Sequence, residues 1–410
     1  MTTLDAIDLT DLACFEHGFP HPAFELLRAE APVFWHRPTA HTPDGEGFWV
    51  ISRHADVLQV FLDPATFSSV GGGPRPQGGT FLEDTPLAGV MLNMMDDPRH
   101  ARIRALVNRG FTPKVIAELE PELRRRAARI VDAVAPAGAC DLVVDIAREL
   151  PLQAICMLLG VPQEDRRELG DWADLTLETG DRSDAAAQAA RREASGRVAG
   201  YAAQLIAERR ARAGDDVLSQ VIHATLPGEA SPSLDDGELV QFFFLLFAAG
   251  SETTRKAVAG GIHELLRDLA QLRWIREQGR VPAAAVEEIV RFTSPSVYKR
   301  RTATRDVELC GQKIRAGDKV TVWEASANRD ARVFRDPHRF DLQRTPNPHL
   351  GFGQGVHFCL GANLARLEIR VLIEELLARL EEIEPTGPPV YTRDNRLFGL
   401  KSLPIRFRTR

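Results

Sequence analysis

The sequence is poor in cysteine, and it lacks any pair of cysteines at a spacing that would bind zinc or an iron–sulfur cluster. Its five cysteines, Cys14, Cys140, Cys156, Cys310 and Cys359, are scattered over 410 residues without a CxxC pair. With this spacing we expect neither a disulfide framework nor a metal centre held by several thiolates. An intracellular, reducing compartment is therefore expected, and we predict a cytoplasmic protein.

The sequence also lacks an excess of positive charge and a hydrophobic run long enough to span a membrane. The formal net charge is −6 and there is no basic tail, so nucleic acid is not an expected partner. The longest apolar stretch, residues 239–250, is interrupted by Gln241 and is shorter than the roughly 20 residues that a span requires. Residues 1–5 lack the basic and apolar regions of a signal peptide. We expect no membrane insertion.

No linker or change in composition divides the chain, which predicts a single catalytic unit with a large apolar core, since 44% of its residues are hydrophobic. Helical periodicity dominates, which predicts a mainly α fold with small β-sheets. The predicted helices are 98–108, 113–134, 141–159, 163–178, 184–211, 215–224 and 233–269, the last N-capped by Ser233. Residues 47–51 and 401–407 are predicted strands, and 307–314 followed by 319–323 predicts a small hairpin region. A long Gly/Pro-rich connection, 66–95, is of the kind that is usually functional or mobile.

One cysteine stands apart from the others, because Cys359 lies on a glycine-rich loop directly before an amphipathic helix. Glycines permit close approach of the backbone to a flat ligand. The free N–H groups at the start of the helix stabilise negative charge on sulfur, and such a thiolate can bind a haem iron. The alternative is a cysteine buried for packing alone, and the glycine-rich loop around Cys359 argues against it.

A second feature is the run Ala248-Ala249-Gly250-Ser251-Glu252-Thr253-Thr254 in the middle of the longest predicted helix. Small residues leave room for a ligand against the helix, and hydroxyl groups compete for main-chain hydrogen bonds. A plain crossing of two helices at small residues would produce the same pattern, so the run alone leaves both interpretations open.

The cysteine loop resembles the metal-ligand loop of the cytochrome P-450 family, Phe-x-x-Gly-x-His/Arg-x-Cys-x-Gly, with Phe352, Gly355, His357, Cys359 and Gly361 at the fixed positions. The resemblance implies haem b with Cys359 as its axial ligand. It also implies the fold of that family, a triangular helical prism crossed by one long helix. The expected single domain covers 1–410, with a helix-rich core at about 98–300 and 355–385 and small β regions at about 30–60, 300–325 and 385–410.

The run around Glu252 resembles the oxygen-binding helix of the same family, Ala/Gly-Gly-x-Asp/Glu-Thr-Thr. The resemblance implies that Thr253 is the catalytic alcohol and Glu252 the catalytic acid, which relay protons to dioxygen; Thr254 is taken as structural. Glu288-Ile289-Val290-Arg291 resembles the family's Glu-x-x-Arg motif, which is structural, and Arg339 is the arginine expected to join it. A weak exposed helical ion pair is the alternative for that motif alone.

The resemblance further implies contacts to the haem and its propionates. His100 and Arg104, four residues apart on one helical face, and Arg301 and His357 are the expected partners of the propionates, although any one of them alone suits a solvated surface. The remaining expected haem contacts are Phe352, Gly353, Ala249 and Gly361.

An apolar substrate is expected, because residues 242–248 before the acid–alcohol pair are strongly hydrophobic. The candidate substrate contacts are Phe244, Ala248, Leu92, Val297 and Phe398. The segments 91–98, 109–113, 326–330 and 347–351 look like those of bacterial members that oxidise methyl-branched lipids and sterol side chains. They are scaffold segments and do not identify a substrate.

The resulting hypothesis is a haem-thiolate monooxygenase that hydroxylates a C–H bond of a hydrophobic small molecule such as a methyl-branched lipid, terpenoid or steroid. The chain has no GxGxxG fingerprint and no iron–sulfur spacing, so electrons from NAD(P)H are expected to arrive through a ferredoxin and a ferredoxin reductase. We expect a monomer. A steering surface for the acidic partner is expected at Arg99, Arg102, Arg109 and Lys114, which ordinary solvated charge explains nearly as well.

Three alternatives remain. A natural-product tailoring oxidase would use the same oxygen chemistry for hydroxylation, epoxidation or ring closure on a macrolide, terpenoid or carrier-bound intermediate, and only a binding screen separates it. A peroxide-driven enzyme would share Cys359 but usually replaces the acid–alcohol pair, which this chain retains. A haem-based ligand sensor or carrier would not need Glu252 and Thr253.

Overall fold

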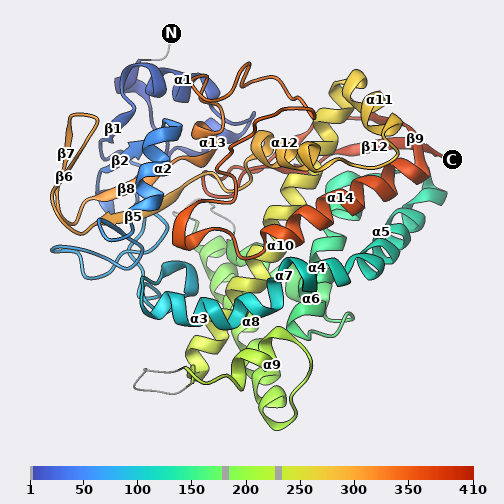
Figure 1. Ribbon diagram of the computed structural model, residues 1–410, viewed down its shortest axis with the longest axis horizontal. Helices are drawn as coiled ribbons and strands as arrows, with labels where there is room; N and C mark the ends of the chain where they lie inside the picture. The colour runs from blue at the N-terminus through green and yellow to red at the C-terminus, as the bar shows by residue number, and fades with distance from the viewer. Residues whose placement is uncertain (1–2, 178–183, 227–232) are drawn as a thin grey trace. The chain divides into compact units, whose positions relative to one another are not determined.

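A computed structural model describes residues 3–177, 184–226 and 233–410 of the chain (Figure 1). These residues form two compact units, each assembled from three segments. The first unit contains residues 1–99, 287–359 and 391–399, and the second contains 100–286, 360–390 and 400–410. Because both units are built from distant segments, neither corresponds to a continuous half of the sequence. The expectation of one domain stays a prediction.

The first unit is built around a five-stranded sheet with the order β1-β2-β8-β5-β3. Strands β2 and β8 pair in parallel, and both are buried along their whole length, as expected for strands covered on both faces. Helix α2 packs its apolar side against this sheet through Val57, Val60 and Phe61. The strands are β1 (Val33–His36), β2 (Phe48–Ile51), β3 (Phe67–Ser68), β5 (Lys299–Ala303) and β8 (Lys319–Val322), with a separate hairpin β6 (Val307–Leu309) and β7 (Gln312–Ile314).

The helices of the first unit are short. They are α1 (His21–Glu30), α2 (His54–Leu62), α13 (Glu324–Ala327) and most of α12 (Ala283–Thr293). After α13 the chain runs without regular structure to the cysteine loop. A side chain of α12, Arg291, donates hydrogen bonds to carbonyl groups of this irregular stretch.

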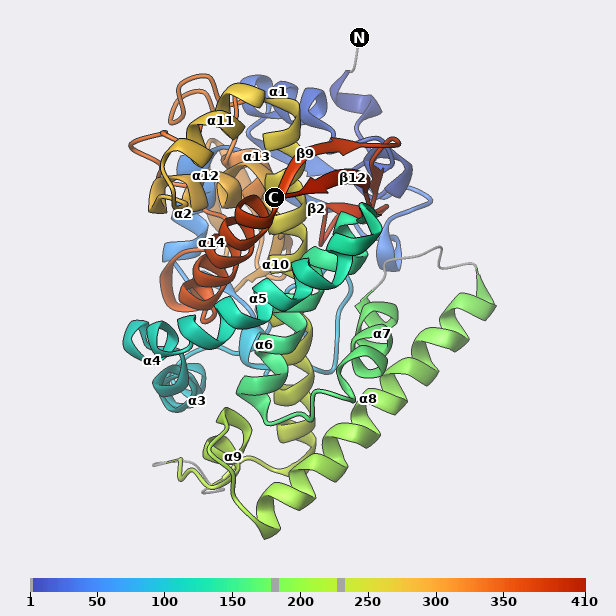
Figure 2. The same ribbon diagram turned by 90° about the vertical axis from the view of Figure 1, so that its right-hand side faces the viewer.

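The second unit is mainly helical. Its longest helix, α10 (Asp236–Arg267), packs against α6, α7, α8 and α14. Figure 2 shows α7 lying beside the long helix α8. The other helices are α3 (Arg99–Val107), which begins one residue before the unit, α4 (Pro113–Glu118), α5 (Glu120–Val134), α6 (Glu149–Leu159), α7 (Arg166–Leu177), α8 (Ala185–Ala211), α9 (Val217–Ile222), α11 (Leu269–Glu277) and α14 (Ala362–Arg379).

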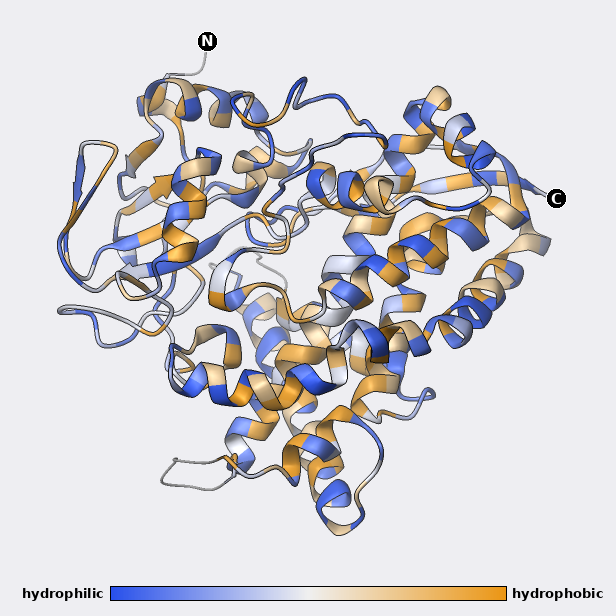
Figure 3. Ribbon diagram, viewed as in Figure 1, coloured by the Kyte–Doolittle hydropathy of each residue, from blue (hydrophilic) through white to orange (hydrophobic). Residues whose placement is uncertain are grey.

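Three strands close the second unit as a sheet with the order β4-β12-β9. They are β4 (Ala139–Asp141), β12 (Pro404–Thr409) and β9 (Leu380–Pro385), and a small pair is formed by β10 (Val390–Tyr391) and β11 (Leu400–Ser402). Figure 3 shows hydrophilic and hydrophobic residues mixed along α5, as expected for a helix that buries one side only. Leu123, Ala127, Ile130 and Val131 are its buried residues.

The prediction of a mainly helical fold with small sheets is confirmed, and the helix boundaries differ where local chemistry ends a helix. The predicted helix 113–134 is two helices, because Pro121 cannot donate the hydrogen bond that a continuous helix needs. Helix α10 is capped by Asp235 rather than Ser233, in a capping box with Glu238. It ends at Arg267 because the Asp268 side chain accepts hydrogen bonds from the first turn of α11.

The predicted helix 141–159 also differs, since residues Leu142–Ala147 form a π-helical segment before α6 begins at Glu149. Position 178, the predicted end of α7, lies outside the described residues. In the described part of the chain no helix is long and apolar enough to cross a membrane.

Candidate functional site

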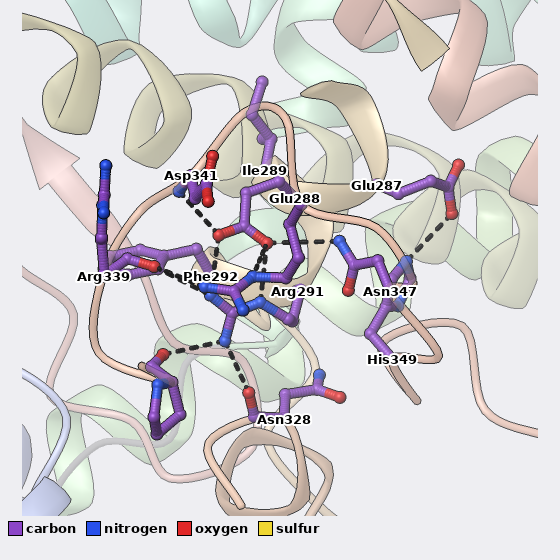
Figure 4. Close-up of polar contacts among 12 residues, drawn as sticks. Glu287, Glu288, Ile289, Arg291, Phe292, Asn328, Arg339, Asp341, Asn347 and His349 are labelled. Carbon is purple, nitrogen blue, oxygen red and sulfur yellow. Dashed lines mark hydrogen bonds and ion pairs between the residues drawn. The ribbon is translucent and has the colours of Figure 1, made fainter. Parts of the chain in front are cut away.

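The Glu288–Arg291 pair is buried in the first unit and makes several hydrogen bonds. Both side chains have no exposed surface, and the Arg291 guanidinium donates two hydrogen bonds of 2.7 Å to the Glu288 carboxylate. It also donates to the carbonyls of Asn328 at 2.7 Å, Pro337 at 2.9 Å and Arg339 at 3.2 Å (Figure 4). The pair therefore holds the irregular stretch that leads to the cysteine loop.

The arginine that joins this pair through its side chain is Arg344, which corrects the prediction of Arg339. The Arg344 guanidinium donates to Glu288 at 3.1 Å, while the exposed Arg339 contributes only its carbonyl group. The backbone N–H of Asp341 and the side chain of Asn347 complete the bonding of Glu288, at 2.9 and 3.2 Å. Both arginines belong to the same segment, and only their side-chain directions distinguish them.

Glycine makes the cysteine loop possible at two positions. Gly353 and Gly355 have φ values of 68° and 71°, in the left-handed region that other residues rarely adopt. A Cβ on Gly355 would lie 2.6 Å from the carbonyl oxygen of Phe61 in α2. The backbone N–H of Cys359 donates to the Phe352 carbonyl at 2.8 Å, which closes the loop three residues before α14 begins. The structure thus confirms two expected features, glycine-dependent turns in the loop and a helix that begins just after it.

His357 and Arg301 lie in the same unit as the cysteine loop. The His357 imidazole is 3.2 Å from the Ser69 hydroxyl, and the Ser69 N–H donates to Asp96 at 2.9 Å. Arg301 is 4% exposed, and its hydrogen bond within the described chain goes to the Arg300 carbonyl at 2.8 Å. Burial lowers the pKa of Arg301 to about 10, against the opposing effects of Asp96 and Glu324. A buried guanidinium with so few protein acceptors suits an anionic ligand.

Within the second unit, one narrow face of α10 is accessible while most of the helix is buried. Ala249 is exposed, and Leu245 and Thr253, four residues to either side, are half-buried. The Thr253 hydroxyl donates to the Ala249 carbonyl at 3.0 Å, and the Ser251 hydroxyl donates to the Phe247 carbonyl at 3.0 Å. The face therefore carries a hydroxyl group beside small side chains, as the sequence predicted. Leu245 is a member of this face that the sequence analysis missed.

Glu252 is buried in an ion network on the same helix. Its carboxylate contacts the Arg255 guanidinium and lies 2.9 Å from the Lys256 ammonium. Burial alone would raise the pKa of Glu252, but Lys256 and Arg255 outweigh it and lower the pKa to about 2. Arg255 also donates to Asp174 of α7 at 2.8 Å, and burial raises the pKa of Asp174 despite this contact. Glu252 is therefore a carboxylate at neutral pH.

The remaining predicted cofactor residues of the second unit lie on α3 and α14. His100 is buried and Arg104, one turn later on α3, is half-buried. Gly361 is the N-cap of α14, and a Cβ there would meet nothing within 4 Å. A flat ligand can thus approach this backbone closely.

The predicted substrate contacts fall into two groups. In the first unit, Val297 and Phe398 are buried in one apolar cluster with Leu82, and Leu92 is also buried. In the second unit, Phe244 is half-buried and Ala248 is buried, next to the accessible face of α10. The structure thus brings Val297 and Phe398 together in the first unit, while Phe244 and Ala248 belong to the second.

A buried acid that the sequence analysis missed is Glu368 on α14. It is 1% exposed, and neither carboxyl oxygen makes a hydrogen bond of ordinary geometry with a described residue. Burial raises the pKa of Glu368 to about 8, although the nearby Thr254 hydroxyl of α10 favours the charged form. In the sequence Glu368 is one of several charged residues in a predicted helix, and no motif distinguishes it from the others.

Comparison with known proteins gives the family. The model of the family described as Cytochrome P-450 matches residues 280–408. Cytochrome P-450 126 of Mycobacterium tuberculosis is 53% identical over 412 residues, 100% of both chains. The methyl-branched lipid omega-hydroxylase of the same species is 42% identical over 395 residues, 93% of this chain and 90% of the relative.

Among solved structures, a cytochrome P-450 of Mycobacterium marinum in complex with pseudoionone has a TM-score of 0.90 at 36% identity, covering 99% of this chain and 100% of that one. The family implies a cysteine-ligated haem and the use of dioxygen, and the cysteine loop described above has the required residues in place. The chain belongs to the cytochrome P-450 family and is a P-450 monooxygenase.

Proposed function

We propose that this monooxygenase hydroxylates a C–H bond of a hydrophobic small molecule, such as a methyl-branched lipid, terpenoid or steroid. The observation that carries the proposal is Cys359 on its glycine-dependent loop, in a chain that also retains the Glu252–Thr253 pair. The similarity to a methyl-branched lipid omega-hydroxylase supports the substrate class. The apolar residues Phe244 and Ala248 beside the accessible face of α10 agree with a substrate of this kind.

The residues of the first unit fit a haem b. Cys359 would hold the iron, and Arg301 and His357 would bind the propionates, with Phe352 and Gly353 beside the ring. Arg301 carries the fit, because a buried guanidinium whose hydrogen bonds within the described chain reach one carbonyl has donors to offer an anion. For His100, Arg104, Ala249 and Gly361 the role in haem binding stays a prediction. When bound, the haem supplies the activation of dioxygen.

The roles of the acid and the alcohol follow from their contacts. The Thr253 hydroxyl donates a hydrogen bond to the Ala249 carbonyl, so its oxygen is free to accept a hydrogen bond from water or a bound oxygen species. Glu252 is a carboxylate held by two cations, so it acts by accepting a proton and passing it on. That transfer requires Arg255 or Lys256 to release one carboxylate oxygen.

Electrons are proposed to come from NAD(P)H through a ferredoxin and its reductase. Arg109 and Lys114 are exposed and Arg99 and Arg102 are half-buried, so the cations suited to steer an acidic ferredoxin are partly accessible. Reduction kinetics that slow steeply with added salt would support this route.

The test is the visible spectrum of the purified, reduced protein with carbon monoxide. We expect the red-shifted band of a haem thiolate in the wild type and its loss in Cys359→His with haem still bound. A band that survives this substitution would contradict the ligand assignment. Titration of the ferric protein with branched fatty acids, sterols, terpenes and macrolides then identifies the class that shifts the spin state, and a shift with macrolides alone would favour natural-product tailoring.

A further inference from the structure

Arg300 and Arg301 are consecutive residues of β5 and lie on opposite faces of the strand. Residues next to each other in a strand point to opposite sides. Arg301 is the proposed propionate partner, and Arg300 is also buried, with no exposed surface. Burial lowers the pKa of Arg300, so this charge needs strong partners to be tolerated. The family assignment gives Arg300 no role.

The partners of Arg300 come mainly from one short segment, residues 80–84. Its guanidinium donates to the carbonyls of Phe81 at 3.2 Å and Leu82 at 3.1 Å and pairs with the Asp84 carboxylate at 2.7 Å. Its backbone N–H donates to the Thr80 carbonyl at 3.0 Å. The remaining hydrogen bond of the guanidinium within the described chain goes to Thr302 on the same strand, at 3.3 Å.

Further contacts connect this segment to the residues around it. Asp84 also pairs with Arg75, which donates to the Gly317 carbonyl at 2.9 Å and pairs with Glu46 at 2.7 Å. The Thr85 N–H donates to the Gly78 carbonyl at 3.1 Å and closes the turn. Arg75 therefore connects Asp84 to the turn at Gly317, before β8, and to Glu46, before β2.

The segment also reaches the apolar cluster that holds candidate substrate contacts. Leu82 is 3% exposed and packs in the cluster with Val297 and Phe398. The Phe81 ring lies under the guanidinium of Arg396, 4.7 Å from the ring centroid. Eight residues after Asp84 the chain arrives at Leu92, through the half-buried apolar residues Leu87, Ala88 and Val90.

We propose that Arg300 is a specificity-determining positioning residue. Through Asp84 and the two carbonyl groups it holds residues 80–84, and thereby fixes the position of residues 87–92 on the substrate side. The part of this proposal that concerns substrate rests on the proposed function. The part that concerns the segment rests on the hydrogen bonds alone. Arg300 and Arg301 together make β5 the strand that aligns this segment with the cofactor.

The experiment measures amide hydrogen exchange of the haem-loaded protein in Arg300→Lys and Asp84→Asn. Lysine cannot donate to two carbonyls and a carboxylate in one plane, so exchange of residues 78–92 should quicken at least tenfold. Asp84 is 35% exposed, so its substitution leaves the core intact if Arg300→Lys fails to fold. Arg305→Lys is the control, because this exposed arginine contacts Thr66 instead. Unchanged exchange in Asp84→Asn would overturn the proposal.

Specificity is measured in the same proteins by ferric titration with imidazole and 4-phenylimidazole. The ratio of their two dissociation constants should change at least threefold in Arg300→Lys and Asp84→Asn and stay constant in Arg305→Lys. Faster exchange with an unchanged ratio would overturn the specificity role. The carbon monoxide band separates the two hypotheses: its absence in the wild type overturns the proposed function, while the exchange result still decides the role of Arg300.

Discussion

Arg255 is shared by two carboxylates, Glu252 three residues earlier on its own helix and Asp174 on α7. One guanidinium nitrogen contacts Glu252, and the other donates to Asp174 at 2.8 Å. The proposed catalytic acid is thus connected to a neighbouring helix through one side chain. Because Glu252 is held as a carboxylate, the proposed proton transfer would require Arg255 or Lys256 to release one of its oxygens.

Replacing Glu252 by glutamine should lower the free energy of unfolding, and the size of this loss should depend on pH. The pKa of Glu252 lies at about 2, below its ordinary value of 4.5, so its contribution is fully present above pH 4.5 and is lost as the pH falls toward 2. We expect Glu252→Gln to lower the free energy of unfolding by about 3 kcal/mol at pH 7. At pH 3 the difference from the wild type should be clearly smaller. Urea unfolding at the two pH values, at equal haem content, measures it.

Removing the hydroxyl of Thr253 should uncouple electron flow from oxidation. Thr253→Ala deletes the group that donates to the Ala249 carbonyl, and no neighbouring side chain of this helix face replaces it. We expect hydrogen peroxide released per NAD(P)H consumed to rise several-fold, measured with ferredoxin and reductase supplied. Thr253→Ser keeps the hydroxyl and should remain close to the wild type. Equal peroxide yields in all three proteins would contradict the proton role.

The correction from Arg339 to Arg344 gives a paired test on stability. Arg344→Ala removes a buried partner of Glu288 and should lower the free energy of unfolding by about 3 kcal/mol. Arg339→Ala leaves the carbonyl that Arg291 uses and should change it by less than about 0.5 kcal/mol. Thermal unfolding and haem retention of the two variants check this difference. Equal effects would restore Arg339 as the structural partner.

Glu368 should make the protein less stable as the pH rises. An acid whose folded pKa is raised from 4.5 to about 8 binds its proton more tightly in the folded state, so stability falls between these values. The loss is about 1.4 kcal/mol per pH unit at most. Glu368→Gln should remove this slope, so the variant gains on the wild type from pH 5 to pH 8. The exposed Glu384→Gln should follow the wild type in the same denaturation series.

The family and the catalytic motifs were predictable because each is a short, continuous run. The loop around Cys359 places two positive-φ glycines and its thiol within seven residues, and Thr253 reaches its acceptor Ala249 along one helix. Such features depend on local geometry, which residue type and spacing largely determine. The mainly helical character followed from periodicity in the same way. The break at Pro121 was not predicted, although the missing N–H of proline explains it.

The features that the sequence did not reveal are contacts between segments far apart in the chain. Arg344 rather than Arg339 pairs with Glu288, Arg255 reaches Asp174, and Arg300 reaches Asp84. Each depends on which way a long, flexible side chain turns once its surroundings are packed, and burial then makes the choice costly to reverse. The sequence by itself determined the family, and it predicted the cysteine loop as the metal-binding site and Glu252–Thr253 as the acid–alcohol pair. Only the tertiary structure decided which charges are paired, because desolvation and distance exist only in the folded chain.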